Sequence, residues 1–198
     1  PIKGFDFLIR VFGKIRDEIP EARLLLIGDG PEMARLFTLS RQLGLRAGTE
    51  LDPKSLDVIF AGFYENPINI LQVARVFVMP SRSEGLPNVL IEAVASGVPI
   101  LASDCSEGSR TVLSRPGESL GFTDSDWPLK LENGTLMPVP DHPDSQMVWA
   151  QEMQSVLRHP RQVRNREMCH QAIERFDIKS TGQMWLNLIK IAGEQEND

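Results

Sequence analysis

The stretch VFVMPSRSEGLPNVLIEAVASGVPILAS, residues 76–103, contains a strand, a turn, a helix and a second strand in direct succession. The continuous apolar runs VFVMPS and VPILAS are typical of strands buried on both faces, whereas the apolar residues of NVLIEAVAS recur at helical spacing. Two strands joined through a helix are the repeating unit of a parallel α/β sheet. The stretch therefore predicts an α/β fold.

The same alternation occurs on the amino-terminal side of this stretch. Helical patterns at residues 5–15, 33–43 and 68–74 alternate with strand patterns RLLLIG at 23–28 and VIFAG at 58–62. Four strands alternating with helices predict a Rossmann-like, doubly wound parallel sheet. The polar stretches 46–57 and 114–133 are predicted to be surface insertions.

The remainder of the chain is predicted to be a helical tail over residues 143–193, because its apolar residues keep a helical period. A length of 198 residues favours one domain over residues 1–198. The chain begins at Pro1 and enters a helical pattern almost at once, so we expect it to be part of a longer protein.

Composition excludes some classes of partner. The net charge is −6, and the 21 Lys and Arg residues are scattered along the chain, so nucleic acid is not an expected partner. No apolar run approaches the roughly 20 residues that a membrane span requires. The two cysteines, Cys105 and Cys169, are too few for a disulfide framework and favour a reducing compartment.

Ligands of open α/β sheets bind outside the carboxyl ends of the strands. The four predicted strands are followed by GDGPE, GFYENP, PSRSEGLPN and SDCSEGSR, and three of these loops combine glycine with the start of a helix. Glycine lets backbone approach a ligand, and a helix N-terminus offers unpaired amides to an anion, so the loops suit phosphate. The alternative is that glycine and proline only make tight turns.

Two glutamates flank the third of these loops. Pro87 fits the first helical turn, which leaves the amides near Asn88 and Val89 free to face an anion. Glu84 precedes the helix and Glu92 lies inside it, and both would be repelled by phosphate, so we expect them to accept hydrogen bonds from hydroxyl groups on either side of it. Alternatively, Glu84 is a helix N-terminal charge and Glu92 a solvated surface residue.

The segment VIFAGFYENPINILQVARVFVMPSRSEGLPNVLIEAVASGVPILASDCSEGSRTVL resembles the retaining glycosyltransferases of family 4. The likeness extends from KGFDFLI through LLLIGDGPE to GTLMPVPD, and it includes the family's pair of glutamates separated by seven residues. These enzymes have the GT-B fold, in which two Rossmann-like domains enclose the active site. The resemblance implies that the chain is the carboxyl-terminal, donor-binding half of such an enzyme, without the amino-terminal acceptor domain.

The resemblance also implies residue roles. Glu84 would contact hydroxyls of the donor sugar, and Glu92 would hold the ribose. Lys3 matches the family lysine that pairs with the diphosphate, whereas the family's partner arginine would precede Pro1. The diphosphate and sugar would lie against the backbone of Gly85, Leu86, Pro87, Asn88 and Val89, in which every residue except Pro87 has an N–H group.

Four further residues match family positions around the nucleotide. Gly28 and Gly30 match the glycines of another loop, and Phe63 with Tyr64 occupies the position at which family members bind the nucleobase. Read without the resemblance, Lys3 could be a solvated residue and Phe63 a core residue.

The implied reaction is transfer of a hexose or N-acetylhexosamine from a nucleotide-sugar, with UDP preferred, to an acceptor hydroxyl with retention of anomeric configuration. Lys3 and the helix start would stabilise the leaving diphosphate, so neither a metal nor another cofactor is expected. The D-x-D sequence at residues 124–126 is interpreted as solvated loop. No general base is assigned, because His142, His159 and His170 lie far in sequence from the donor loops.

The implied setting is polysaccharide or glycolipid synthesis in the cytoplasm, with peripheral contact of the full-length protein at the inner face of the cytoplasmic membrane. The acceptor, a saccharide or lipid-linked saccharide, would bind through the absent domain, so the chain alone is expected to be inactive. Two alternatives stay open: a GT-B sugar-nucleotide epimerase, and a noncatalytic nucleotide-binding module.

Overall fold

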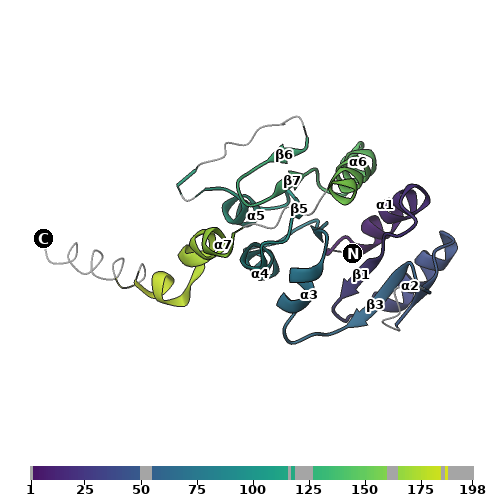
Figure 1. Cartoon of the computed structure of the whole chain (residues 1–198), viewed down its shortest axis with the longest axis horizontal. Helices are drawn as coiled ribbons and strands as arrows, with labels where there is room; N and C mark the ends of the chain where they lie inside the picture. The colour runs from purple at the N-terminus through teal and green to yellow at the C-terminus, as the bar shows by residue number, and fades with distance from the viewer. Residues whose placement is uncertain are drawn as a thin grey trace, which may run out of the picture.

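The computed structural model describes residues 2–49, 55–115, 117, 118, 127–159, 165–183 and 186. The strands run through the middle of the molecule with helices on both sides (Figure 1). This arrangement is the Rossmann-like, doubly wound α/β fold that the sequence predicts.

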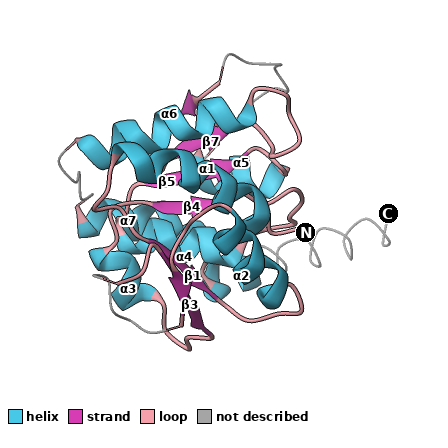
Figure 2. Cartoon of the chain, turned by 90° about the vertical axis from the view of Figure 1, so that its right-hand side faces the viewer, coloured by secondary structure: helices cyan, strands magenta, loops and turns pink. Residues whose placement is uncertain are grey.

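Hydrogen bonding groups the strands into two sheets. The first has the order β1 (Leu24–Ile27), β3 (Val58–Gly62), β2 (Ala47–Gly48), and the second has the order β4 (Phe77–Met79), β5 (Ile100–Ser103), β7 (Thr135–Met137), β6 (Leu129–Lys130). All neighbouring strands are parallel except β6 and β7. Strands β7, β5, β4, β1 and β3 follow one another across the molecule (Figure 2), and within each sheet the parallel strands place their carboxyl ends at the same edge.

The helices cover both faces of this layer. The described helical elements are α1 (Phe5–Glu18), α2 (Met33–Gln42), α3 (Ile68–Val73), α4 (Asn88–Ser96), α5 (Glu107–Leu113), α6 (Ser145–Arg158), α7 (Arg166–Ile173) and η1 (Glu174–Phe176). Successive strand residues point to opposite faces. Leu101 and Met137 accordingly pack in the cluster of α1, α2 and α6, whereas Ile100 and Leu136 pack in the cluster of α3, α4, α5 and α7.

Helix α1 is anchored by an apolar face against the sheet and α6. Six of its residues are buried: Phe7, Leu8, Ile9, Val11, Phe12 and Ile15. The ring of Phe7 meets that of Trp149 edge-on at 5.8 Å between centroids, and Trp149 Nε1 donates to the Pro138 carbonyl at 2.8 Å. Because α1 is packed in this way, the backbone directly before it, which includes Lys3, is held in a defined position.

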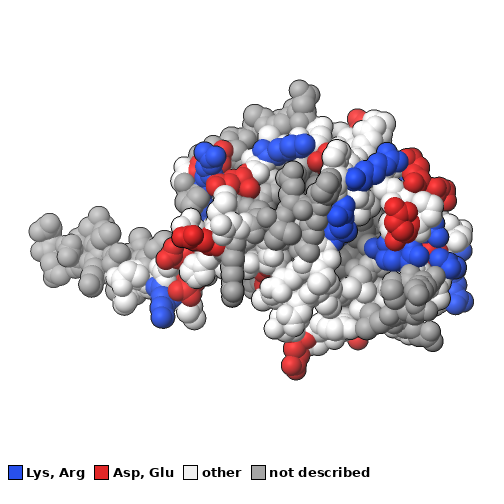
Figure 3. Space-filling model, viewed as in Figure 1, with Lys and Arg blue, Asp and Glu red and all other residues white. Residues whose placement is uncertain are grey.

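Two other expectations can be judged in the described residues. Residues 145–158, 166–173 and 178–183 are helical, which confirms the helical character of this part of the tail. Acidic and basic side chains are interspersed on the face drawn in Figure 3, in agreement with the scattered charge of the sequence. The D-x-D sequence at residues 124–126 lies outside the described residues.

The four strands predicted from the sequence are confirmed, but the prediction that residues 46–57 and 114–133 are surface insertions is wrong at their ends. Ala47–Gly48 forms β2 at the edge of the first sheet, and Leu129–Lys130 forms β6 at the edge of the second. Strands of two residues are too short to produce a readable alternation. A third missed strand, β7, lies in the interior of its sheet.

Asp57 closes the first of these stretches as a buried charge, with an exposed fraction of 3%. Its carboxylate accepts hydrogen bonds from Arg46 Nε at 3.0 Å, from the Arg46 amide at 2.9 Å and from Arg16 Nε at 2.6 Å. The bond from Arg46, with help from Arg16, outweighs burial and holds the pKa of Asp57 far below its usual range. The stretch is thereby tied to β3 and α1.

We expect Asp57→Asn to lower the free energy of unfolding at pH 7 by about 3 kcal/mol, because it removes one partner of a buried ion pair. The pKa of Asp57 is lower in the folded than in the unfolded chain, where it is about 4, so the carboxylate stabilises the fold fully above pH 4. This stabilisation decreases as the pH falls from that value toward the folded-state pKa. Urea denaturation of both proteins between pH 7 and pH 3 measures the difference. If the difference in free energy of unfolding between the two proteins stayed constant from pH 7 to pH 3, the stabilising role of the Asp57 charge would be contradicted.

Candidate functional site

The candidate site is built from the loops that follow the carboxyl ends of β1, β3, β4 and β5. The first two loops are joined directly, because the Gly28 amide donates to the Gly62 carbonyl at 2.7 Å. Gly28 has a φ of 122° and Gly62 a φ of 71°, values that side-chain-bearing residues rarely adopt. Glycine is thus required at these positions by backbone conformation.

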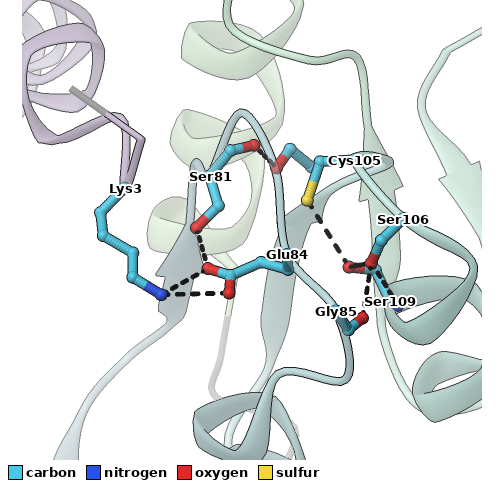
Figure 4. Close-up of polar contacts among 8 residues, drawn as sticks. Lys3, Ser81, Glu84, Gly85, Cys105, Ser106 and Ser109 are labelled. Carbon is cyan, nitrogen blue, oxygen red and sulfur yellow. Dashed lines mark hydrogen bonds and ion pairs between the residues drawn. The ribbon is translucent and has the colours of Figure 1, made fainter.

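The β4–α4 loop carries Glu84, whose carboxylate has two side-chain partners (Figure 4). Lys3 Nζ donates to its oxygens at 2.8 and 3.0 Å, and Ser81 Oγ donates to Oε1 at 2.7 Å. The side chain of Glu84 is 12% exposed and that of Lys3 is 63% exposed. The structure therefore brings together two residues that the sequence assigns to one site from positions 81 residues apart.

The loop is held at its first residue by the segment before α1. Gly4 has a φ of 68°, and a Cβ built on it would lie 1.8 Å from the Pro80 carbonyl oxygen. No side chain fits there, so the backbone of Gly4 lies directly on Pro80. This close contact places the neighbouring Lys3 beside the loop.

Helix α4 begins where the loop ends. Pro87 is buried and caps the helix with φ −78° and ψ 102°, so it precedes the first turn by one residue instead of lying within it. The first amides of a helix have no carbonyl partner within it, which leaves those of Asn88 and Val89 at the site edge. Leu86 is 51% exposed and Val89 is 38% exposed, while Glu92 is half-buried in the helix.

The β5–α5 loop supports the other end of the β4–α4 loop. Ser106 caps α5 by accepting from the Ser109 amide at 3.1 Å, and its hydroxyl donates to the Gly85 carbonyl at 3.2 Å. A Cβ on Gly108 would lie 2.0 Å from that same carbonyl oxygen. Ser103 Oγ, from the end of β5, donates to the Ser81 carbonyl.

A buried ion pair fixes the start of α5. Arg110 Nε and Nη2 donate to the two oxygens of Asp104 at 2.6 and 2.5 Å, and Arg110 is 8% exposed. The hydrogen bonds that Arg110 donates to Asp104 raise the pKa of the guanidinium above its usual value. These residues stabilise the loop that supports Gly85.

The sequence reasoning did not identify the supporting residues Ser81, Ser106 and Gly108. A hydroxyl residue three positions before a glutamate, as in Ser81 and Glu84, signals local hydrogen bonding, and serine before the EGSR start of α5 is a capping signal. The contact of Gly108 with Gly85 joins two loops, and no sequence pattern near either glycine indicates it.

The remaining predicted residues lie in the loops after β1 and β3. Gly30 is exposed, and Tyr64 is half-buried. Phe63 is 76% exposed, so the alternative that it is a core residue is wrong. Gly28 and Gly30 thus belong to the loop after β1, Phe63 and Tyr64 to the loop after β3, and Glu84 to the loop after β4.

Other candidate features can be placed in the described part of the chain. There, no three His, Cys, Asp or Glu side chains are arranged to share a metal ion. No helix among the described residues has the length and apolarity to cross a membrane. Asn133, the asparagine of the NGT sequence, is 3% exposed, and its Nδ2 donates to the Val112 and Ser114 carbonyls, so it is a structural residue of the α5 C-terminus.

The chain matches the protein family described as glycosyl transferases group 1 over residues 1–147 of its 198 residues. The chain belongs to the group 1 glycosyltransferases. Relatives include an uncharacterized glycosyltransferase of Methanocaldococcus jannaschii, 35% identical over 111 residues, or 56% of this chain and 25% of the relative. A lipopolysaccharide core biosynthesis glycosyltransferase of Rhizobium meliloti is 35% identical over 118 residues, or 60% of this chain and 30% of the relative. This group 1 chain thus spans less than a third of the length of either relative.

Solved structures with the same fold cover nearly the whole chain. The Anabaena HepE structure in complex with UDP and glucose is 19% identical, with a TM-score of 0.69 over 96% of this chain and 45% of HepE. The pneumococcal O-GlcNAc transferase GtfA in complex with UDP and GlcNAc is 22% identical, with a TM-score of 0.67 over 95% of this chain and 33% of GtfA. These likenesses confirm that this group 1 glycosyltransferase chain has the Rossmann-like fold of a GT-B domain.

Two helical glycines allow the packing of the loops to be tested. We expect Gly108→Ala to destabilise this group 1 chain by about 1–3 kcal/mol, because the added methyl group forces α5 away from Gly85. Gly13→Ala in α1 is the matched control, since its Cβ meets nothing within 4 Å, and it should stabilise by about 0.5–1 kcal/mol. Thermal and urea unfolding measure both. Stabilisation by both substitutions would contradict the close contact.

Proposed function

We propose that this chain is the carboxyl-terminal, donor-binding domain of a retaining glycosyltransferase. The enzyme would transfer a hexose or N-acetylhexosamine from a UDP-sugar to an acceptor hydroxyl and release UDP. The observation that carries the proposal is the apposition of Lys3 and Glu84 beside the start of α4, because it offers a cation, a hydrogen-bond acceptor for hydroxyls and free amides within one small region.

The diphosphate is assigned to the backbone N–H groups of Gly85, Leu86, Asn88 and Val89, around the start of α4, and to Lys3. Helix N-termini carry partial positive charge, and the ammonium adds a full charge. As the bond between sugar and diphosphate breaks, negative charge grows on the leaving group, so these fixed donors stabilise the transition state more than the bound donor. The proposed reaction therefore needs no metal ion.

The hydroxylated parts of the donor are assigned to the two glutamates. Glu84, before the helix, would accept hydrogen bonds from the transferred sugar, and Glu92, inside it, would accept them from the ribose. Phe63 and Tyr64, with Gly28 and Gly30, would bound the nucleobase end. Exposure of Phe63 at the site edge supports a ligand contact there.

The choice of UDP is supported by the solved relatives whose structures are in complex with UDP. One relative, from Corynebacterium glutamicum, is named as GDP-mannose-dependent, which makes GDP the competing nucleotide. The relatives named for lipopolysaccharide core biosynthesis support polysaccharide or glycolipid synthesis. The acceptor would bind a separate amino-terminal domain, with the reaction in the cytoplasm or at the inner membrane face.

Calorimetric titration of the 198-residue chain with UDP, GDP, ADP and their sugars tests the proposal. We expect Glu92→Ala to lower the affinity for UDP about tenfold. Glu84→Ala should lower the affinity for the UDP-sugar about tenfold and that for UDP by less, because each variant loses charge-assisted hydrogen bonds to a different part of the donor. Glu21→Ala, which removes an exposed carboxylate between α1 and β1, is the matched control and should change neither affinity. Chelation with EDTA should also leave UDP affinity unchanged.

Several outcomes would contradict the proposal. Absence of binding at millimolar concentration by the folded chain would remove both the transferase and the epimerase. Equal losses for UDP and UDP-sugar in both variants would overturn the two glutamate roles. A change of sugar configuration in the proton NMR spectrum of the incubated donor would favour the epimerase, and tight binding of UDP alone would favour a noncatalytic module.

A further inference from the structure

Arg82 lies two residues before Glu84 in the β4–α4 loop and bonds to side chains outside that loop. Its Nη1 donates to Asp6 Oδ1 at 3.0 Å and its Nη2 to Asp6 Oδ2 at 3.4 Å, while its Nε donates to Asp141 Oδ1 at 3.1 Å. Asp6 is the second residue of α1, and Asp141 precedes α6. One guanidinium thus ties the loop to two other parts of the fold.

The backbone of the same loop fastens the residues around Lys3. The Arg82 amide donates to the Ile2 carbonyl at 2.7 Å, and Gly4 lies directly on the Pro80 carbonyl. Residues 2, 4 and 6 are therefore each attached to the loop, by a backbone bond, a close contact and an ion pair in turn. Lys3 lies between the first two attachments.

The ion pair with Asp6 is better shielded from water than the contact that Lys3 makes. The side chains of Arg82 and Asp6 are 26% and 23% exposed, whereas that of Lys3 is 63% exposed. Burial alone would raise the pKa of Asp6, but the hydrogen bond and charge of Arg82 outweigh it and lower the pKa, so Asp6 is ionised at neutral pH. An exposed lysine pair is weak by itself, and its geometry depends on where the backbone holds it.

We propose that Arg82 is a positioning residue that fastens residues 2–6 to the β4–α4 loop and thereby places the Lys3 ammonium at the Glu84 carboxylate. Arg82 acts through Lys3 and not on the ligand. Its effect on ligand affinity rests on the proposed function, whereas its effect on Lys3 does not.

Selective acylation of lysines, read by mass spectrometry, tests the placement of Lys3 without any ligand. In Arg82→Met, Lys3 should react up to about fivefold faster, the factor expected when an exposed ion pair is lost, while Lys14 and Lys130 keep their rates. Arg158→Met is the matched control, because it removes the pair with Glu18 at the opposite end of α1. An unchanged Lys3 rate, or an equal rise at all lysines, would overturn the proposal.

A double-mutant cycle on UDP affinity tests whether Arg82 acts through Lys3. Lys3→Met and Arg82→Met should each lower the affinity for UDP about tenfold. The double variant should bind UDP no more weakly than either single variant. Arg82→Lys should fall between wild type and Arg82→Met, because an ammonium cannot reproduce the forked contacts with two carboxylates. Additive losses in the double variant would overturn the proposal. Failure of wild type to bind UDP would instead contradict the proposed function, and the acylation rates would still decide the positioning role.

Discussion

The β4–α4 loop is held between two glycines, and the candidate site depends on this packing. Gly4 lies on the Pro80 carbonyl at the beginning of the loop, and Gly108 lies on the Gly85 carbonyl near its end. A methyl group at either glycine would come within about 2 Å of an oxygen atom, closer than atoms can approach without backbone movement. These contacts fix the backbone of the loop at both ends, and the loop backbone in turn sets the positions of Glu84 and of the start of α4.

This constraint brings charges together without burying them completely. Lys3 forms an ion pair with Glu84, and Ser81 donates a hydrogen bond to one oxygen of the same carboxylate. A diphosphate beside these residues would offer Lys3 a stronger partner, while hydroxyl groups could take its place at the carboxylate. The groups that hold Glu84 and Lys3 together are thus the same groups that the proposed donor would need, in a chain that belongs to the group 1 glycosyltransferases.

The sequence predicted the parts of the fold that depend on local patterns. The strand runs around residues 24–27, 58–62, 77–79 and 100–103 are apolar enough to be recognised, and the helices between them keep a clear period. Strands β2 and β6 were missed because two residues carry no periodicity. The segment of β2 is tied to the fold by the contacts of Asp57 with Arg46 and Arg16, which join residues far apart in the sequence. Glu84, Lys3 and Glu92 were proposed from motif and resemblance, and the structure places Lys3 against Glu84. The roles of Gly108 and Arg82 arise from contacts between distant segments, which the sequence alone does not reveal.

The central claim is that the start of α4 binds a diphosphate while Glu84 and Glu92 hold the hydroxylated groups on either side of it. A crystal structure of the chain with UDP-glucose tests this claim most directly. We expect phosphate density at the backbone N–H groups of Gly85, Leu86, Asn88 and Val89, Lys3 turned toward a phosphate oxygen, the glucose at Glu84 and the ribose at Glu92. Density for the nucleotide at another edge of the sheet, with Lys3 still on Glu84 and Glu92 facing solvent, would contradict it.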